Sequence, residues 1–170
     1  MKPKIKPKIK LYHGAFSPVD KPNIEQGRPS TDFGKGFYTT TNFEQAKRWA
    51  LHKQKNAKEE VKAIVNTYEV DDDILDNDIY RVKKFDNPNE EWLSFVINCR
   101  KSMLHDYEIV FGAVANDKIY TTITLYESQI LTAAETIARL KVNEYFNQIS
   151  FHSQEAANEL TFVESIEVSE

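Results

Sequence analysis

The stretch DFGKGFYTT, residues 32–40, carries the strongest structural signal in this chain. Its two glycines, one residue apart, permit a sharp change of backbone direction, and the aromatic and β-branched residues 37–40 favour a strand. Thr41, with Glu44 three positions later, matches a helix capping box. Apolar residues then recur at helical spacing, namely Phe43, Ala46, Ala50 and Ala57. The sequence therefore predicts a strand at 37–40 followed by a helix over 43–57.

The first ten residues, MKPKIKPKIK, contain five lysines and no acidic residue. The lysines alternate, so an extended segment would carry them on one face, and its other face would continue through Leu11 to His13. We expect a strand that brings His13 to the end of a sheet, with Gly14 ending it. Two interpretations of residues 1–10 remain open: a basic arm for phosphate groups, or an edge segment that lysine and proline protect from aggregation.

Downstream, runs rich in β-branched and aromatic residues predict further strands at 61–70, 107–114, 119–126, 147–152 and 162–168. The runs 107–114 and 119–126 are separated by turn residues and form a predicted hairpin. Capping residues predict three more helices, which begin after Asn87, Thr132 and Ser153. About six strands and four helices, mixed rather than strictly alternating, predict an α+β domain with a largely antiparallel sheet.

Composition excludes several classes of protein. The 170 residues fit one domain, and 41% apolar residues with a net charge of −4 exclude a disordered polyelectrolyte. The single cysteine, Cys99, cannot form an internal disulfide, and no Cys or His pair has metal-ligand spacing, so no metal is expected. No apolar run approaches the ~20 residues of a membrane span, and the N-terminus lacks the apolar core of a secretion signal. We expect a cytoplasmic protein without membrane contact.

Taken singly, the possible functional motifs are weak. DFG occurs in protein kinases, but no HRD-type catalytic loop accompanies it here. GKG lacks the third glycine of a dinucleotide loop and the lysine–hydroxyl pair of a P-loop. A lone histidine such as His13 is more often structural than catalytic. The ordered combination of LYHG at 11–14, FGKGFY at 33–38 and NQISF at 147–151 is more specific.

That combination resembles the ADP-ribosyltransferase superfamily, in its diphtheria-toxin and poly-ADP-ribose-polymerase branch, over residues 11 to about 152. The resemblance implies an ADP-ribosyltransferase-like split antiparallel β-sheet core with flanking helices, formed by a single domain over residues 11–170 after the basic arm. It also implies NAD as the substrate. The whole chain, including YEIVFGAVAND at 107–117, is more loosely similar to an uncharacterised bacterial subfamily whose genes often lie beside small partner genes, as in toxin–antitoxin pairs.

The resemblance assigns roles to residues of the first two motifs. His13 would hydrogen-bond a ribose hydroxyl of NAD, because a neutral imidazole offers a donor and an acceptor. Gly14 would hold the nicotinamide carboxamide through its backbone, and Gly36 belongs to the same NAD-binding set. Tyr38 would lie against the nicotinamide ring. Trp49 stands where relatives have a second stacking aromatic, with core packing as the equal alternative.

Two basic side chains complete the expected site. Arg28, in the loop before the glycine segment, could meet the NAD pyrophosphate, because a guanidinium suits phosphate oxygens. A surface salt bridge is the even alternative. His152 would face the same side as Gln148 in a regular strand, which makes it a secondary contact.

Gln148 is the main departure from the family pattern, in which a glutamate bonds the ribose hydroxyl and activates the acceptor. A glutamine can hold the hydroxyl, but it carries no charge and accepts no proton. The change points to transfer of a single ADP-ribose, a different acceptor or a feeble enzyme. Glu144 or Asp117 could supply a carboxylate from outside the motif, although both are expected to be surface acids.

Three functions follow from the resemblance. The first is an NAD-dependent mono-ADP-ribosyltransferase that modifies a macromolecule, protein or nucleic acid, as the toxin of a pair with a small antitoxin protein. The second is an NAD glycohydrolase. The third is a module that binds NAD or ADP-ribose without turnover. Outside the first ten residues the net charge is −9, which disfavours phosphate-rich acceptors over most of the surface.

Overall fold

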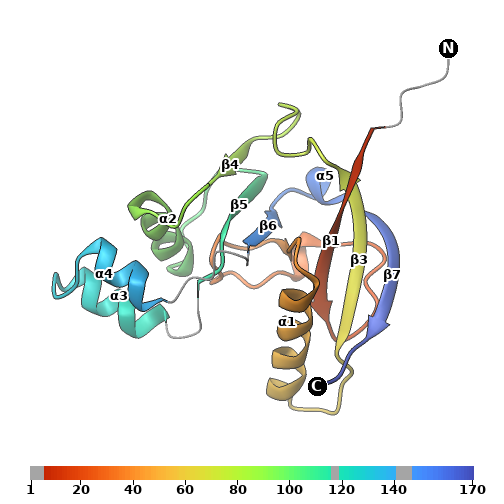
Figure 1. Cartoon of the computed structure of the whole chain (residues 1–170), viewed down its shortest axis with the longest axis horizontal. Coiled ribbons are helices and arrows are strands. Elements are labelled where there is room, and N and C mark those ends of the chain that lie inside the picture. Colours follow the sequence, from red (N-terminus) through yellow and green to blue (C-terminus); the bar gives the residue numbers. More distant parts are fainter. Residues whose placement is uncertain (1–5, 116–118, 141–146) are drawn as a thin grey trace.

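A computed structural model describes residues 6–115, 119–140 and 147–170 of the chain (Figure 1). Within these residues the strands are β1 (Lys8–Ala15), β2 (Phe37–Thr39), β3 (Ile64–Asp71), β4 (Val82–Lys84), β5 (Ile109–Ala113), β6 (Asn147–Phe151) and β7 (Thr161–Glu167). The α-helices are α1 (Phe43–Asn56), α2 (Glu90–Arg100), α3 (Ile119–Glu127), α4 (Ala133–Arg139) and α5 (Gln154–Ala157), and a 3-10 helix covers Ile24–Gln26. The α+β class is therefore confirmed.

The strands form two sheets that meet at one point. The first sheet has the order β1-β3-β7 and the second has the order β2-β6-β5-β4. All neighbours are antiparallel except β4 and β5, so the largely antiparallel prediction is correct. Tyr12 of β1 and Thr40, just after β2, exchange two backbone hydrogen bonds of 2.9 and 3.0 Å. This bridge connects the edge strands of the two sheets.

Each face of the second sheet buries a separate core. One core contains residues of both sheets, including Leu11, Phe37, Tyr68 and Phe151. The other lies on the opposite face of the second sheet, beneath α2, and includes Phe33 and Trp92. Successive side chains of a strand point to opposite faces, so Phe37 enters the first core while Tyr38 packs against the second. Helix α1 lies along β1 (Figure 1).

The prediction of a strand at 119–126 is wrong, because these residues form α3. The run IYTTITLY has high β propensity, but Ile123 and Tyr126, three positions apart, both pack against the second core. Burial of this helical face outweighs the local preference. The hairpin is therefore absent, although β5 itself was expected.

Helix starts were predicted with mixed success. The capping box of Thr132 and Glu135 is present, and Ser153 caps α5 as expected. The cap of α1 is Asn42, whose side chain accepts from the Gln45 amide, rather than Thr41. The cap of α2 is Asn89, two residues after the predicted one. The cap of α1 therefore lies one residue later than predicted, and the Asn42 carboxamide oxygen accepts from the Gln45 amide where Thr41 was expected to accept from the Glu44 amide.

Two lysines of the N-terminal segment, Lys6 and Lys8, pair with acidic residues. Lys8 lies in β1 and hydrogen-bonds Asp71, and Lys6 lies 3.5 Å from the Asp73 carboxylate. β1 is an edge strand, so these contacts support the edge-segment interpretation. None of the helices within the described ranges is long and apolar enough to cross a membrane.

Candidate functional site

His13 lies in β1, next to the bridge between the sheets. Its Nδ1 lies 2.6 Å from the Tyr38 backbone oxygen, and its ring stacks on Phe37 with the centroids 4.1 Å apart. A carbonyl oxygen only accepts, so Nδ1 carries the proton and Nε2 keeps its lone pair. Burial, together with the positive charge of Lys53, lowers the pKa of His13 to about 3. His13 is thus a neutral, half-buried imidazole with Nε2 as a hydrogen-bond acceptor.

Gly14 is where β1 and α1 pack most closely. A Cβ at this position would lie 2.5 Å from the Ala46 oxygen and 2.7 Å from the Ala50 nitrogen, so glycine is required by the helix. The Gly14 carbonyl accepts from Lys53 Nζ at 2.7 Å. The backbone amide and carbonyl of Tyr12 hydrogen-bond Thr40, so they point away from β3. Backbone groups two residues apart in a strand point to the same side, so the Gly14 amide also points away from β3.

Lys53 brings a second basic group to the His13 end of β1. Its side chain is half-buried on α1, one helical turn beyond Trp49. Burial and the nearby Arg28 guanidinium lower the pKa of Lys53 to about 8. Arg28 itself is exposed, and its charge acts on Lys53. Trp49 is half-buried, which is compatible with both of its interpretations.

The Tyr38 hydroxyl is held by the segment that precedes β2. It donates to the Gly34 oxygen at 2.6 Å and accepts from the Phe33 amide at 2.9 Å, and it lies 2.9 Å from the Thr31 hydroxyl. Burial raises the pKa of Tyr38, so the phenol stays protonated. The ring remains half-buried and contacts Phe33. Tyr38 therefore meets His13 through its backbone, whereas its side chain lies on the other face of β2.

Gln148 lies in β6 with 3% of its surface exposed. Its Nε2 donates to Asp32 Oδ2 at 2.8 Å and to the Ala113 oxygen at 3.2 Å. Both amide hydrogens are thus used, and among the described residues Oε1 accepts no hydrogen bond. In the pairing of β2 with β6, Tyr38 lies opposite Ser150. Gln148 is two residues before Ser150 in β6, so its side chain lies on the same face of the sheet as those of Ser150 and Tyr38.

Gly36 and His152 hold the glycine turn against β6. A Cβ on Gly36 would lie 2.6 Å from the Phe151 oxygen and from His152 Nδ1. His152 Nδ1 donates to the Lys35 oxygen at 2.8 Å, which leaves Nε2 to accept from the Ser150 hydroxyl at 2.7 Å. Burial lowers the pKa of His152 to about 4. His152 thus supports the glycine turn. Both of its ring nitrogens have partners within the protein, so neither is left for the ligand contact that was expected of it.

Glu144 and Asp117, the two carboxylates named as substitutes, lie outside the described residues. The carboxylate that the structure brings to Gln148 is Asp32, which is 5% exposed and pairs with Arg100. No local pattern indicates a role for Asp32 or Lys53, because their partners Gln148 and Gly14 lie 116 and 39 positions away. Only the tertiary fold brings Asp32 to Gln148 and Lys53 to Gly14.

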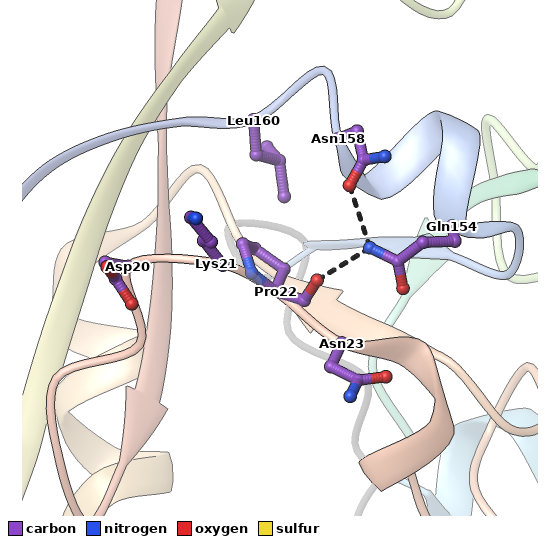
Figure 2. Close-up of a pocket in the computed structure, with 7 residues that line it drawn as sticks. All are labelled: Asp20, Lys21, Pro22, Asn23, Gln154, Asn158 and Leu160. Atoms are coloured by element: carbon purple, nitrogen blue, oxygen red, sulfur yellow. Dashed lines mark hydrogen bonds between the residues drawn. The ribbon is translucent and has the colours of Figure 1, made fainter.

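A cavity of about 500 Å³ lies elsewhere, beside α5 (Figure 2). Its lining consists of Asp20, Lys21, Pro22, Asn23, Gln154, Asn158 and Leu160. The Gln154 amide crosses it, donating to the Pro22 oxygen and to Asn158 Oδ1, both at 2.8 Å. None of the predicted NAD-binding residues lines this cavity. Its lining has neither a ring to stack on a nicotinamide nor a cluster of basic groups.

The chemistry available at the junction of the sheets is polar and cationic. Beside His13, a neutral imidazole acceptor, it includes the basic side chains of Lys53 and Arg28. The Tyr38 ring and the uncharged Gln148 amide lie on the opposite face of the second sheet. Such groups suit a ligand with hydroxyls and phosphates. Within the described ranges, no group of three or more His, Cys, Asp or Glu side chains could hold a metal ion.

Comparison with known proteins gives one match. A family model described as "Protein of unknown function (DUF3990)" matches residues 9–162. No curated protein matches the chain. No solved structure matches it. The matched range contains all three motifs and both junction strands.

Proposed function

The chain belongs to the DUF3990 family of proteins of unknown function, and from its site we propose that it is an NAD-dependent mono-ADP-ribosyltransferase. The observation that carries the proposal is the contact of His13 Nδ1 with the Tyr38 backbone, 2.6 Å long. It joins the histidine of LYHG to the tyrosine of FGKGFY, and the third motif residue, Gln148, lies in β6, the neighbour of β2. Two sheets joined by a single bridge are also compatible with a split-sheet ADP-ribosyltransferase-like fold.

In this proposal the chain's own residues bind and orient NAD. His13 Nε2 accepts from a hydroxyl of the nicotinamide ribose, since Nδ1–H is already used. The Gly14 amide, which points away from β3, donates to the nicotinamide carboxamide, while Lys53 holds the Gly14 carbonyl. Lys53, which is cationic below its pKa of about 8, and the Arg28 guanidinium attract the pyrophosphate.

The reaction breaks the bond between nicotinamide and ribose, and positive charge develops on the ribose. Positioning of the ribose and a polar enclosure lower the barrier of such a step. The half-buried Tyr38 ring supplies the aromatic surface for the nicotinamide. Gln148 contributes its amide oxygen and no charge, which favours transfer of one ADP-ribose over chain elongation. ADP-ribose then passes to a nucleophile of a macromolecular acceptor, and nicotinamide leaves.

A second candidate is a module that binds NAD or ADP-ribose without turnover. The fixed, uncharged amide of Gln148 favours it, because no carboxylate from this position can accept a proton. A third outcome is hydrolysis, in which water takes the place of the macromolecular acceptor. The toxin role, with a small antitoxin protein as partner, rests on the resemblance of the whole chain to a bacterial subfamily.

Labelled NAD separates these candidates. Purified protein is incubated with NAD labelled in its ADP moiety, with and without a cell extract that supplies acceptors. Label bound to protein or nucleic acid is the expected result. Free labelled ADP-ribose would indicate the glycohydrolase, and saturable binding without product would indicate the module. Neither binding nor turnover would overturn the assignment to NAD.

A further inference from the structure

Asp32 is a buried carboxylate with no role in the proposed chemistry so far. Its Oδ1 accepts from Arg100 Nε at 2.9 Å, and its Oδ2 accepts from the Ala115 amide at 2.9 Å and from Gln148 Nε2 at 2.8 Å. Every group that faces Asp32 in these contacts is a donor. The carboxylate is thus fully satisfied, and Arg100 balances its charge.

These contacts fix the orientation of the Gln148 amide. Asp32 Oδ2 and the Ala113 oxygen are both acceptors, so only the nitrogen of the amide can face them. The carbonyl oxygen, Oε1, must therefore point away from Asp32. Since no described residue donates to Oε1, it is the one polar atom of Gln148 left for a ligand.

The same contacts disfavour a glutamate at this position, the residue that the resemblance to ADP-ribosyltransferases would lead one to expect there. A glutamate here would bring a second anionic oxygen against Asp32 Oδ2, at the 2.8 Å now spanned by a hydrogen bond, and another acceptor against the Ala113 oxygen. Like charges at such a distance in a buried site repel strongly. Asp32 thus selects an amide at position 148.

We propose that Asp32 is the positioning residue of the NAD site. It holds the Gln148 amide so that Oε1 accepts a hydrogen bond from the 2′-hydroxyl of the nicotinamide ribose. This inference rests on the proposed function, because it assumes that NAD lies against Gln148. Asp32 touches neither NAD nor the reacting atoms, and it acts only through the amide.

The experiment compares four proteins: the wild type, Gln148→Glu, Asp32→Asn, and the double variant Asp32→Asn/Gln148→Glu. Gln148→Glu places two carboxylates together. Asp32→Asn turns an NH₂ group toward the donors that now face Asp32. In the double variant the asparagine NH₂ can donate to the glutamate and the total charge stays the same, whereas the Ala113 oxygen and the Ala115 amide lose their partners. Gln154→Glu is the matched control, because that amide also donates to two acceptors, far from the site (Figure 2).

The readout is the ratio of two dissociation constants, one for NAD and one for the analogue that lacks the 2′-hydroxyl of the nicotinamide ribose, with thermal unfolding recorded for each protein. A loss of bulk stability alone does not change this ratio. We expect the wild type and Gln154→Glu to prefer NAD by about tenfold, the energy of one well-formed hydrogen bond. Both single variants should lose the preference, and the double variant should recover part of it, because only the contact between positions 32 and 148 is restored.

Two results overturn the inference alone: a wild type that binds NAD without this preference, or single variants that keep it. A double variant that recovers neither folding nor preference relative to the single variants overturns it as well, including the case in which the single variants do not fold. A wild type that binds no NAD overturns the proposed function, and the inference with it. The two failures are therefore distinguishable.

Discussion

His13 and Tyr38 are joined across the two sheets, because Nδ1 of the imidazole donates to the tyrosine's backbone oxygen at 2.6 Å. The contact fixes the tautomer of His13 and turns Nε2 outward as an acceptor. It also ties the end of β1 to β2 beside the Tyr12–Thr40 bridge. A single hydrogen bond thus prepares one side of the proposed NAD site and holds the sheets in register.

The free energy of unfolding should fall as the pH drops from about 6.5 toward 4. His13 and His152 have folded pKa values of about 3 and about 4, below their ordinary 6.5. The unfolded chain therefore binds protons in this range before the folded chain does, so stability is lost. Urea unfolding at pH 7, 5.5 and 4.5 measures the slope. His152→Gln should flatten it, and an identical slope in this variant would contradict the burial of a neutral His152.

NAD affinity should weaken as the pH rises through about 8. Lys53 is cationic below its pKa of about 8 and neutral above it, so its attraction for the pyrophosphate disappears over this range. Lys53→Gln should bind NAD more weakly at pH 7 and show no such decline. Lys55→Gln, an exposed lysine of the same helix, is the control and should match the wild type. Calorimetric titrations between pH 7 and 9 make the comparison, and a decline that persists in Lys53→Gln would exclude this role.

The ring and the hydroxyl of Tyr38 should have separable effects. Tyr38→Phe removes the contacts with Gly34 and Phe33 and leaves a buried amide unpaired, which costs about 1–3 kcal/mol of stability. It keeps the ring, so NAD binding should be retained. Tyr38→Ala removes the ring as well as the hydroxyl, so it should abolish activity and weaken NAD binding in addition to lowering stability. Thermal unfolding and NAD titration of both variants test this, and full activity in folded Tyr38→Ala would refute the stacking role.

Gly14→Ala should destabilise the protein whether or not NAD is present. The added methyl group would lie 2.5 Å from the Ala46 oxygen and 2.7 Å from the Ala50 nitrogen, so α1 must move away from β1. Overpacking of this kind costs about 1–3 kcal/mol. The midpoint of urea unfolding measures the cost. An unchanged midpoint would contradict this expectation and show that α1 can move away from β1 at no cost in stability. A loss of NAD binding in that case would come from the changed backbone at position 14 itself.

Local signals in the sequence predicted the elements that depend on local chemistry. The capping box of Thr132 and the alanine stripe of α1 identify their helices, because hydrogen bonds and packing within one turn determine them. Residues 119–126 were mispredicted because burial of Ile123 and Tyr126 against the second core is a tertiary effect. High β propensity was the weaker influence there.

The candidate site was predictable only in part. LYHG and FGKGFY predicted that the His13 imidazole and the Tyr38 phenol lie against one NAD molecule. In the structure His13 contacts the Tyr38 backbone, and the Tyr38 hydroxyl bonds Gly34 and Phe33, which was not foreseen. Asp32 and Lys53 were missed, since nothing near them in the sequence indicates partners in β6 and β1. A carboxylate directly before FGKG could equally be a surface turn residue, and its contact with Arg100 depends on how α2 packs.

The central claim is that His13, Tyr38 and Gln148 surround one dinucleotide, and calorimetric titration of NAD into the wild type and His13→Ala tests it most directly. We expect saturable binding of one NAD per chain in the wild type. In His13→Ala the affinity should fall by about tenfold or more, the effect of one lost hydrogen bond, with the variant still folded. No binding to the wild type, or equal affinity in the two proteins, would contradict the account.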